Sequence, residues 1–168
     1  MTDAVHEHSD FEWTASSTLA QCAQRDFPWR YYLQTAVEFY ADGQAGTVWP
    51  LDGHEIGCTR PPLGPLHVIT AIQPDTDPTS TENAARMTVL DRELQAAGIA
   101  SIPAIGGSFD GIHREESRAV FGLDDDQARA LGLRFGQVAV FAWRGPQWSL
   151  LACATDRQER RGWRWESR

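Results

Sequence analysis

Lysine, paired cysteines and long apolar runs are all missing from this sequence. Its fifteen basic residues are all arginine, so no lysine can form a Schiff base or serve as an amine nucleophile. The three cysteines, Cys22, Cys58 and Cys153, form no CxxC pair, which excludes the usual zinc-ribbon and dithiol motifs. No segment approaches the roughly 20 apolar residues of a membrane-spanning helix. Because the acidic start at 1–10 also lacks the features of a secretory signal, we expect a cytoplasmic protein without membrane contact.

Signatures of catalysis and nucleotide binding are missing too. The Gly106-Gly107-Ser108 stretch has the spacing of neither a P-loop nor a dinucleotide fingerprint. No GxSxG motif occurs, and no Ser/His/Asp set can be assigned. His113 stands close to Glu115 and Glu116, but without a recognised ligand spacing, so no metal is predicted. The sequence therefore identifies no cofactor and leaves open whether the protein is an enzyme.

The overall charge is acidic. A net charge of −8 disfavours general nucleic-acid binding, which requires a positive surface facing the phosphates. The Arg- and Trp-rich segment 155–168 is a local exception, because aromatic rings can stack on bases and arginines can contact phosphates. Acidic residues interrupt that segment, so we expect Trp163 and Trp165 to pack onto the domain instead.

The residues that are present describe one globular domain. Hydrophobic residues make up 42% and charged residues 23% of the 168 positions, as is typical of a chain with a single buried core. Four segments are expected along the chain. They are a flexible acidic lead (1–15), an extension packed on the core (16–65), the core itself (66–154) and an Arg/Trp-rich tail (155–168).

Periodicity is clearest in the core. Apolar residues recur at helical spacing after the capping residues Ser80 and Thr81, and short apolar stretches around them are typical of strands. The expected core strands are 67–72, 99–105, 117–121, 137–143 and 147–153, with a second helix starting near Leu123. The extension adds a helix at 16–25 and strands at 31–40 and 47–49. We therefore predict an α+β fold, a single domain with a mixed, mostly antiparallel sheet, helices mainly on one face, and the core order β-α-β-β-α-β-β.

Four short segments carry a resemblance to a known family. They are His67-Val68-Ile69-Thr70-Ala71 followed by Pro74, Glu82-Asn83-Ala84-Ala85-Arg86, Glu115-Glu116-Ser117, and Arg134-Phe135-Gly136-Gln137-Val138-Ala139-Val140. In this order they resemble the bacterial domain-of-unknown-function family 3293, over roughly residues 66–154. The resemblance implies a bacterial cytoplasmic protein with one fold unit, and it implies no particular reaction.

Polar residues at the start of the first core helix are the first candidates for a site. Asn83 and Arg86 border the buried stripe near the helix N-terminus, where free N–H groups favour an anion. With Thr70 they could hold a phosphate or a carboxylate. Alternatively, Asn83 and Arg86 could tie the loop at 74–80 to the helix.

A second group lies on the predicted strands. Glu115 shares a strand face with Ser117, whereas Glu116 points to the opposite face. Glu115 is the preferred candidate for a general base and Glu116 the alternative. Gln137 begins an apolar strand, where its amide could contact a ligand or close backbone hydrogen bonds.

Two functions follow from these residues. The first is a non-catalytic binding module for a protein partner or a small polar or anionic ligand, contacted by Thr70, Asn83, Arg86, Ser117 and Gln137. The alternative is a small enzyme acting on a phosphorylated or nucleotide-like metabolite, with Arg86 as anion clamp and Glu115 as base.

Overall fold

The two longest helices of the described chain begin at side chains that cap them. The computed structural model describes residues 5–168. Helix α3 (Thr81–Ala96) starts after Ser80, whose hydroxyl accepts a hydrogen bond from the Asn83 amide, and helix α4 (Asp125–Arg134) starts after Asp124, which forms a reciprocal capping box with Gln127. These side chains satisfy N–H groups that the first helical turn leaves unpaired.

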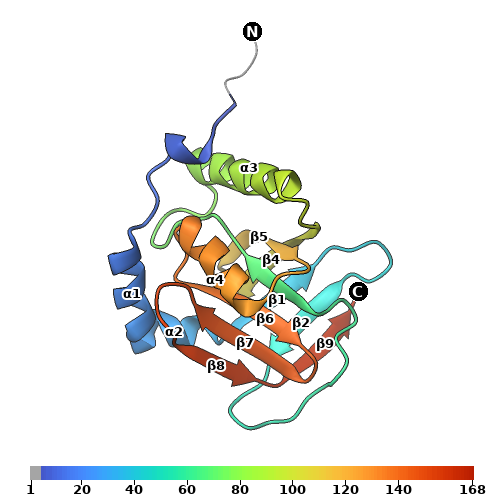
Figure 1. Ribbon diagram of the computed structural model, residues 1–168. Coiled ribbons are helices and arrows are strands. Elements are labelled where there is room, and N and C mark those ends of the chain that lie inside the picture. Colours follow the sequence, from blue (N-terminus) through green and yellow to red (C-terminus); the bar gives the residue numbers. More distant parts are fainter. Residues whose placement is uncertain (1–4) are drawn as a thin grey trace.

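The strands form one antiparallel sheet of nine members in the order β8-β7-β6-β3-β5-β4-β1-β2-β9 (Figure 1). Their bounds are β1 (Thr35–Phe39), β2 (Gly46–Pro50), β3 (Leu66–Ile69), β4 (Ser101–Ser108), β5 (Arg114–Val120), β6 (Ala139–Arg144), β7 (Gln147–Ala152), β8 (Gln158–Arg161) and β9 (Trp163–Ser167). Four neighbouring pairs are consecutive in the chain (β1–β2, β4–β5, β6–β7 and β7–β8), whereas β1 also pairs with β4, β2 with β9, and β3 with both β5 and β6.

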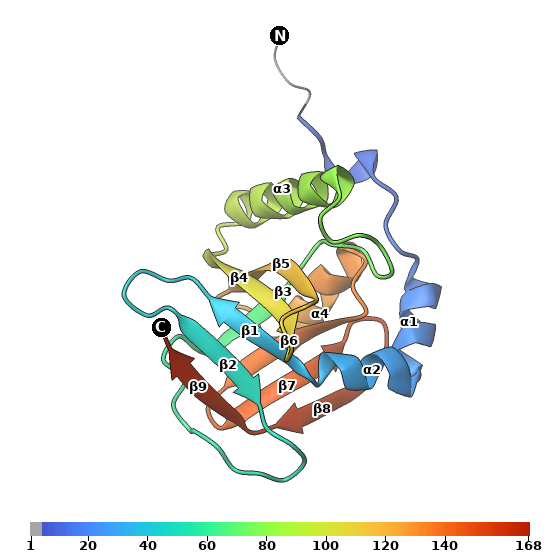
Figure 2. The same ribbon diagram turned by 180° about the vertical axis from the view of Figure 1, so that it is seen from behind.

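The sheet is curled, and its two edge strands follow each other directly in the sequence. The edge strands β8 and β9 are joined by Gly162 alone, and Figure 2 shows them running end to end along one side of the molecule. Gly162 accepts a hydrogen bond from the Leu51 amide through its carbonyl group. A Cβ atom at this position would overlap the Glu55 carbonyl oxygen, so glycine permits this close approach.

The inner face of the curled sheet carries the aromatic part of the core. Trp143 and Trp163 are fully buried there, with their rings edge to face at 4.9 Å. The same cluster contains Val37, Phe39, Val48, Leu66, Val68, Ala104, Ala119 and Trp148. Alternation along each strand sends the intervening side chains to the outer face.

Helices cover the outer face and one end of the sheet. Met87, Leu90 and Leu94 of α3 join the cluster that also holds Ala128 of α4. Helices α1 (Ser16–Gln24) and α2 (Asp26–Tyr32) instead pack Leu19, Ala23 and Trp29 against Val138, Leu150 and Ala152. Figures 1 and 2 show this second helix pair beside β7 and β8.

The predicted fold class is confirmed. The core order from β3 to β7 is β-α-β-β-α-β-β, within a single α+β domain whose strand pairs are all antiparallel. Two elements differ from the expectation. The strand expected at 31–40 begins only at Thr35, because Tyr31 and Tyr32 end helix α2, and the tail at 155–168 contains the edge strands β8 and β9.

Part of the expected acidic lead is described. Residues 1–4 of it lie outside the described part, and a short 3-10 helix, η1, spans His8–Asp10. Trp13 then packs edge to face on the buried ring of Phe135 at 5.2 Å. The N-terminal segment therefore contacts the same cluster that α3 and α4 build.

Candidate functional site

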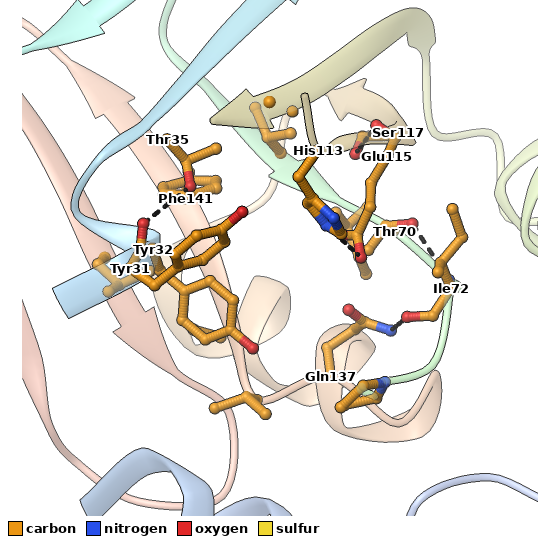
Figure 3. Close-up of a pocket in the computed structure, with 18 residues that line it drawn as sticks. Tyr31, Tyr32, Thr35, Thr70, Ile72, His113, Glu115, Ser117, Gln137 and Phe141 are labelled. Carbon is orange, nitrogen blue, oxygen red and sulfur yellow. Dashed lines mark hydrogen bonds and ion pairs between the residues drawn. The ribbon is translucent and has the colours of Figure 1, made fainter. Parts of the chain in front are cut away.

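A cavity opens at the end of the curled sheet where α2 crosses it. Its volume is about 80 Å³, and Figure 3 shows its polar side chains gathered around it. The side chains that carry the argument below are Tyr31, Tyr32, Thr35, Thr70, His113, Glu115, Ser117, Gln137 and Phe141. The volume is below the usual range of roughly 300–1,000 Å³ for ligand pockets, so the cavity suits a small head group.

Small residues on β4 keep this space open. Gly106 is paired with Glu115 across the β4–β5 ladder, and Ala104 is paired with Ser117. A Cβ atom on Gly106 would lie 3.6 Å from the Thr35 methyl carbon and 4.0 Å from the Ser117 oxygen, which are ordinary contacts. The strand therefore leaves a gap beside Glu115 that a larger side chain would fill.

Gln137 presents an acceptor to the cavity. Its side-chain nitrogen donates to the carbonyl oxygens of Ile72 and Phe135, each at 3.0 Å. Only an NH₂ group can donate to two carbonyls, so this pair fixes the orientation of the amide. The residue is 6% exposed, and within residues 5–168 its Oε1 makes no hydrogen bond. In Figure 3 that oxygen points into the cavity.

Glu115 supplies the carboxylate. Its Oε1 lies 3.4 Å from Nε2 of His113, and 31% of its side chain remains exposed. Burial in the cavity wall raises the pKa of Glu115, and the nearby His113 ring partly opposes this rise. A partly buried carboxylate of this kind is stabilised by a hydrogen-bond donor or a cation.

Two tyrosines from α2 form the opposite wall. The Tyr31 ring lies edge to face against His113, with centroids 5.9 Å apart. Burial, together with the Glu115 charge, raises the pKa of Tyr32, so its hydroxyl stays protonated. Neither tyrosine was among the residues predicted from the sequence, because both were assigned to a strand. The only sequence feature that could have indicated these two wall residues is the Tyr-Tyr pair directly before β1.

The threonine and serine hydroxyls of the wall donate their protons to backbone carbonyls. Thr70 donates to the Glu116 carbonyl at 2.7 Å, and Ser117 to the Glu115 carbonyl at 3.3 Å. Thr35 donates to the Tyr31 carbonyl at 3.2 Å. A hydroxyl has a single proton, so toward the cavity these oxygens can only accept.

Glu116 lies on the other face of β5. It pairs with Arg118 at 2.9 Å, and Arg118 also binds Asp91 of α3 at 2.7 Å. Strand alternation thus separates the two glutamates in the way the sequence predicted, and Glu116 lines no part of the cavity.

Asn83 and Arg86 also lie outside the cavity lining. The Asn83 amide donates to Thr76 and to the Asp77 carbonyl, and it accepts from Arg86 at 2.9 Å. Arg86 in turn donates to the Glu12 carbonyl at 3.2 Å. Of the two alternatives left by the sequence, the contacts match the one in which these side chains tie the loop at 74–80 to α3.

Neither a metal-binding cluster nor a membrane-spanning helix occurs in the described part of the chain. Residues 5–168 contain no group of three or more His, Cys, Asp or Glu side chains placed to hold a metal ion. None of the helices in this range is both long enough and apolar enough to cross a bilayer.

Comparison with known proteins gives one match. Neither the curated proteins nor the solved structures contain a similar chain. A family model matches residues 69–140. This range contains the cavity residues Thr70, Gly106, His113, Glu115, Ser117 and Gln137, whereas Tyr31 and Tyr32 lie before it. The resemblance expected from the sequence is confirmed, since residues 69–140 match the family model described as protein of unknown function (DUF3293).

Proposed function

We propose that this protein is a non-catalytic binding module whose cavity receives a small polar ligand. The observation that carries this proposal is the Gln137 amide, which is 6% exposed and whose Oε1 faces the cavity without a partner among residues 5–168. This oxygen is not among the buried side-chain atoms of residues 5–168 that lack a partner, so water can reach it in the cavity. A ligand that donates to it would replace that water at an acceptor of fixed orientation, which supports a binding role.

The alternative enzyme requires Arg86 and Glu115 to act on one substrate. Glu115 lines the cavity and Arg86 does not. The Arg86 guanidinium is engaged by Asn83, the Glu12 carbonyl and Glu82. These contacts give the anion clamp no support, and a volume of about 80 Å³ has no room for a nucleotide.

A cytoplasmic location remains part of the proposal, supported by three cysteines that are all free.

The test uses a library of small polar fragments, including amines, alcohols, amides and carboxylic acids. Binding is followed by chemical-shift changes in ¹H–¹⁵N spectra. We expect at least one fragment to shift the Gln137 side-chain amide and the backbone amides of Gly106 and Gly107 in a saturable way. If no fragment moves these signals at its solubility limit, the binding proposal is wrong.

Gly106→Ala provides the matched variant. The added methyl group meets only ordinary contacts at 3.6 and 4.0 Å, and replacing a glycine at compatible backbone angles stabilises a fold by about 0.4–1 kcal/mol. We therefore expect Gly106→Ala to raise the melting temperature while weakening fragment binding. A variant that is more stable but binds as well as the parent chain would place the ligand elsewhere.

A further inference from the structure

The polar wall of the cavity is rich in acceptors. Both Gln137 N–H groups are directed to backbone carbonyls, which leaves Oε1 free toward the cavity. The Thr35, Thr70 and Ser117 hydroxyls have donated their protons to the backbone. Together with the Glu115 carboxylate, these groups offer several lone pairs, whereas the donors of the lining are the Tyr31 and Tyr32 hydroxyls and the His113 ring. A matching ligand must therefore carry several donors on a compact head.

The charges of the wall favour a cation. Among residues 5–168, Glu115 is the acidic residue of the lining, and no arginine lines the cavity. His113 contacts the Glu115 carboxylate at one edge, at 3.4 Å. A partly buried carboxylate with only the His113 ring beside it is stabilised by a cation that also donates hydrogen bonds.

Aromatic rings surround the same space. Tyr31, Tyr32 and Phe141 line it together with the carboxylate and the amide oxygen (Figure 3). The negative face of an aromatic ring attracts an ammonium or guanidinium group. The small volume selects the more compact of these two head groups.

We propose that the cavity selects the primary ammonium group of a small organic amine. The three ammonium protons are shared between Glu115, Gln137 Oε1 and the hydroxyl oxygens, and the rings of α2 cover the cation. Beyond the lining, Phe27 is 75% exposed and its ring lies edge to face against Tyr31 at 6.3 Å. An apolar substituent of the amine leaves the cavity along this rim. This assignment rests on the binding function proposed above and names its ligand class.

Three probes of equal chain length test the assignment. The full chain is titrated with n-butylammonium, n-butanol and n-butyrate at constant ionic strength, and binding is followed by chemical shifts of the Gln137 side-chain amide and the His113 ring. We expect saturable binding of n-butylammonium that is tighter than binding of the other two by about tenfold or more, because only the cation forms an ion pair with Glu115 in addition to its hydrogen bonds.

Glu115→Gln and Glu116→Gln form a matched pair of variants. Both remove one carboxylate from neighbouring positions of β5, but only Glu115 faces the cavity. We expect Glu115→Gln to weaken n-butylammonium binding by about tenfold or more and Glu116→Gln to leave it unchanged. Gly106→Ala, which we expect to be more stable than the parent, also weakens it. Equal losses in the two Gln variants would overturn the role of Glu115.

The outcomes separate the two proposals. If n-butanol or n-butyrate binds in the cavity as well as n-butylammonium or better, the amine assignment is overturned and the small-ligand cavity stands. If none of the three probes shifts the Gln137 or His113 signals, and the fragment library is also silent, both proposals are overturned. If the library yields only fragments without an amine, the amine assignment alone is overturned.

Discussion

Glu115 and Glu116 are neighbours in the chain with opposite surroundings. Glu116 meets Arg118 at 2.9 Å on the outer face of β5. Glu115 faces the cavity, where His113, Tyr31 and Tyr32 are the titratable groups around it. Burial dominates at Glu115 and raises its pKa. Two identical side chains thus differ because strand alternation places one of them away from water.

The raised pKa of Glu115 predicts how stability changes with pH. The folded state binds the Glu115 proton more tightly than the unfolded chain, whose value is 4.5. Tighter proton binding in the folded state favours folding at low pH. The free energy of unfolding therefore falls as the pH rises from below 4.5 through the raised pKa of Glu115 in the folded state. We expect Glu115→Gln to remove this loss, so that the variant gains stability relative to the parent as the pH increases across this range.

Denaturant unfolding at several pH values measures this effect. Glu116→Gln is the control, because it leaves Glu115 in place and should retain the pH dependence of the parent chain. If Glu115→Gln and Glu116→Gln have the same profile, the Glu115 carboxyl group is not desolvated in the folded protein.

At the scale of the elements, α3 and the N-terminal segment are joined by Arg86. Its guanidinium binds the Glu12 carbonyl at 3.2 Å and lies 5.5 Å from the Phe11 ring and 5.7 Å from the Trp13 ring. Such contacts fix the path of the segment across the cluster under α3. Arg86 therefore acts on the fold of this region, at a distance from the cavity lining.

Arg86→Met keeps the apolar stem and removes the donors. We expect a loss of about 1–3 kcal/mol in the free energy of unfolding, because the Glu12 carbonyl loses its Arg86 donor and the Asn83 amide oxygen keeps only the Gln73 amide. Hydrogen exchange should accelerate in residues 8–14 and stay unchanged in β4 and β5. Binding of n-butylammonium should be unaffected after correction for the folded fraction. If a folded Arg86→Met variant no longer bound n-butylammonium, Arg86 would have to contribute to the binding site.

The elements also show what the sequence could and could not predict. Helix α3 was evident because its apolar stripe and its Ser80 cap are local features, and the alternation around Glu115 is local as well. The last two residues of helix α2 were assigned to a strand because Tyr31 and Tyr32 favour strands, whereas packing of the helix against β7 overrides that preference. The strands β8 and β9 have no clear apolar alternation, since each pairs with only one neighbour.

The cavity itself could be predicted only in part. Thr70, Glu115, Ser117 and Gln137 were candidates because polar residues beside apolar stretches stand out in the sequence. Their meeting point depends on the curl of the sheet, and on the gap that Gly106 leaves opposite Glu115. Neither is visible in a local pattern, so the sequence could not separate these residues from Asn83.

At the scale of the whole molecule, closure of the sheet depends on the single residue between β8 and β9. A Cβ atom on Gly162 would overlap the Glu55 carbonyl oxygen and lie 3.3 Å from the Gly57 amide nitrogen. We expect Gly162→Ala to lower the free energy of unfolding by about 1–3 kcal/mol, because the loop at 51–57 must move to admit it.

Thermal or denaturant unfolding tests this expectation, with Gly106→Ala as the opposite case. The two variants make the same chemical change, and their effects should differ in sign because only Gly162 is crowded. Equal effects would mean that the approach of the loop to β9 does not contribute to stability.

The position of the two edge strands also determines when the sheet can form during synthesis. Both β7 and β2 obtain their outer partners from residues 158–167, so each keeps an unpaired edge until this segment leaves the ribosome. During that interval the nascent chain exposes two edges to which other chains could add a strand. Protection of the growing chain is therefore needed most just before residue 158 emerges, and one short stretch then covers both edges.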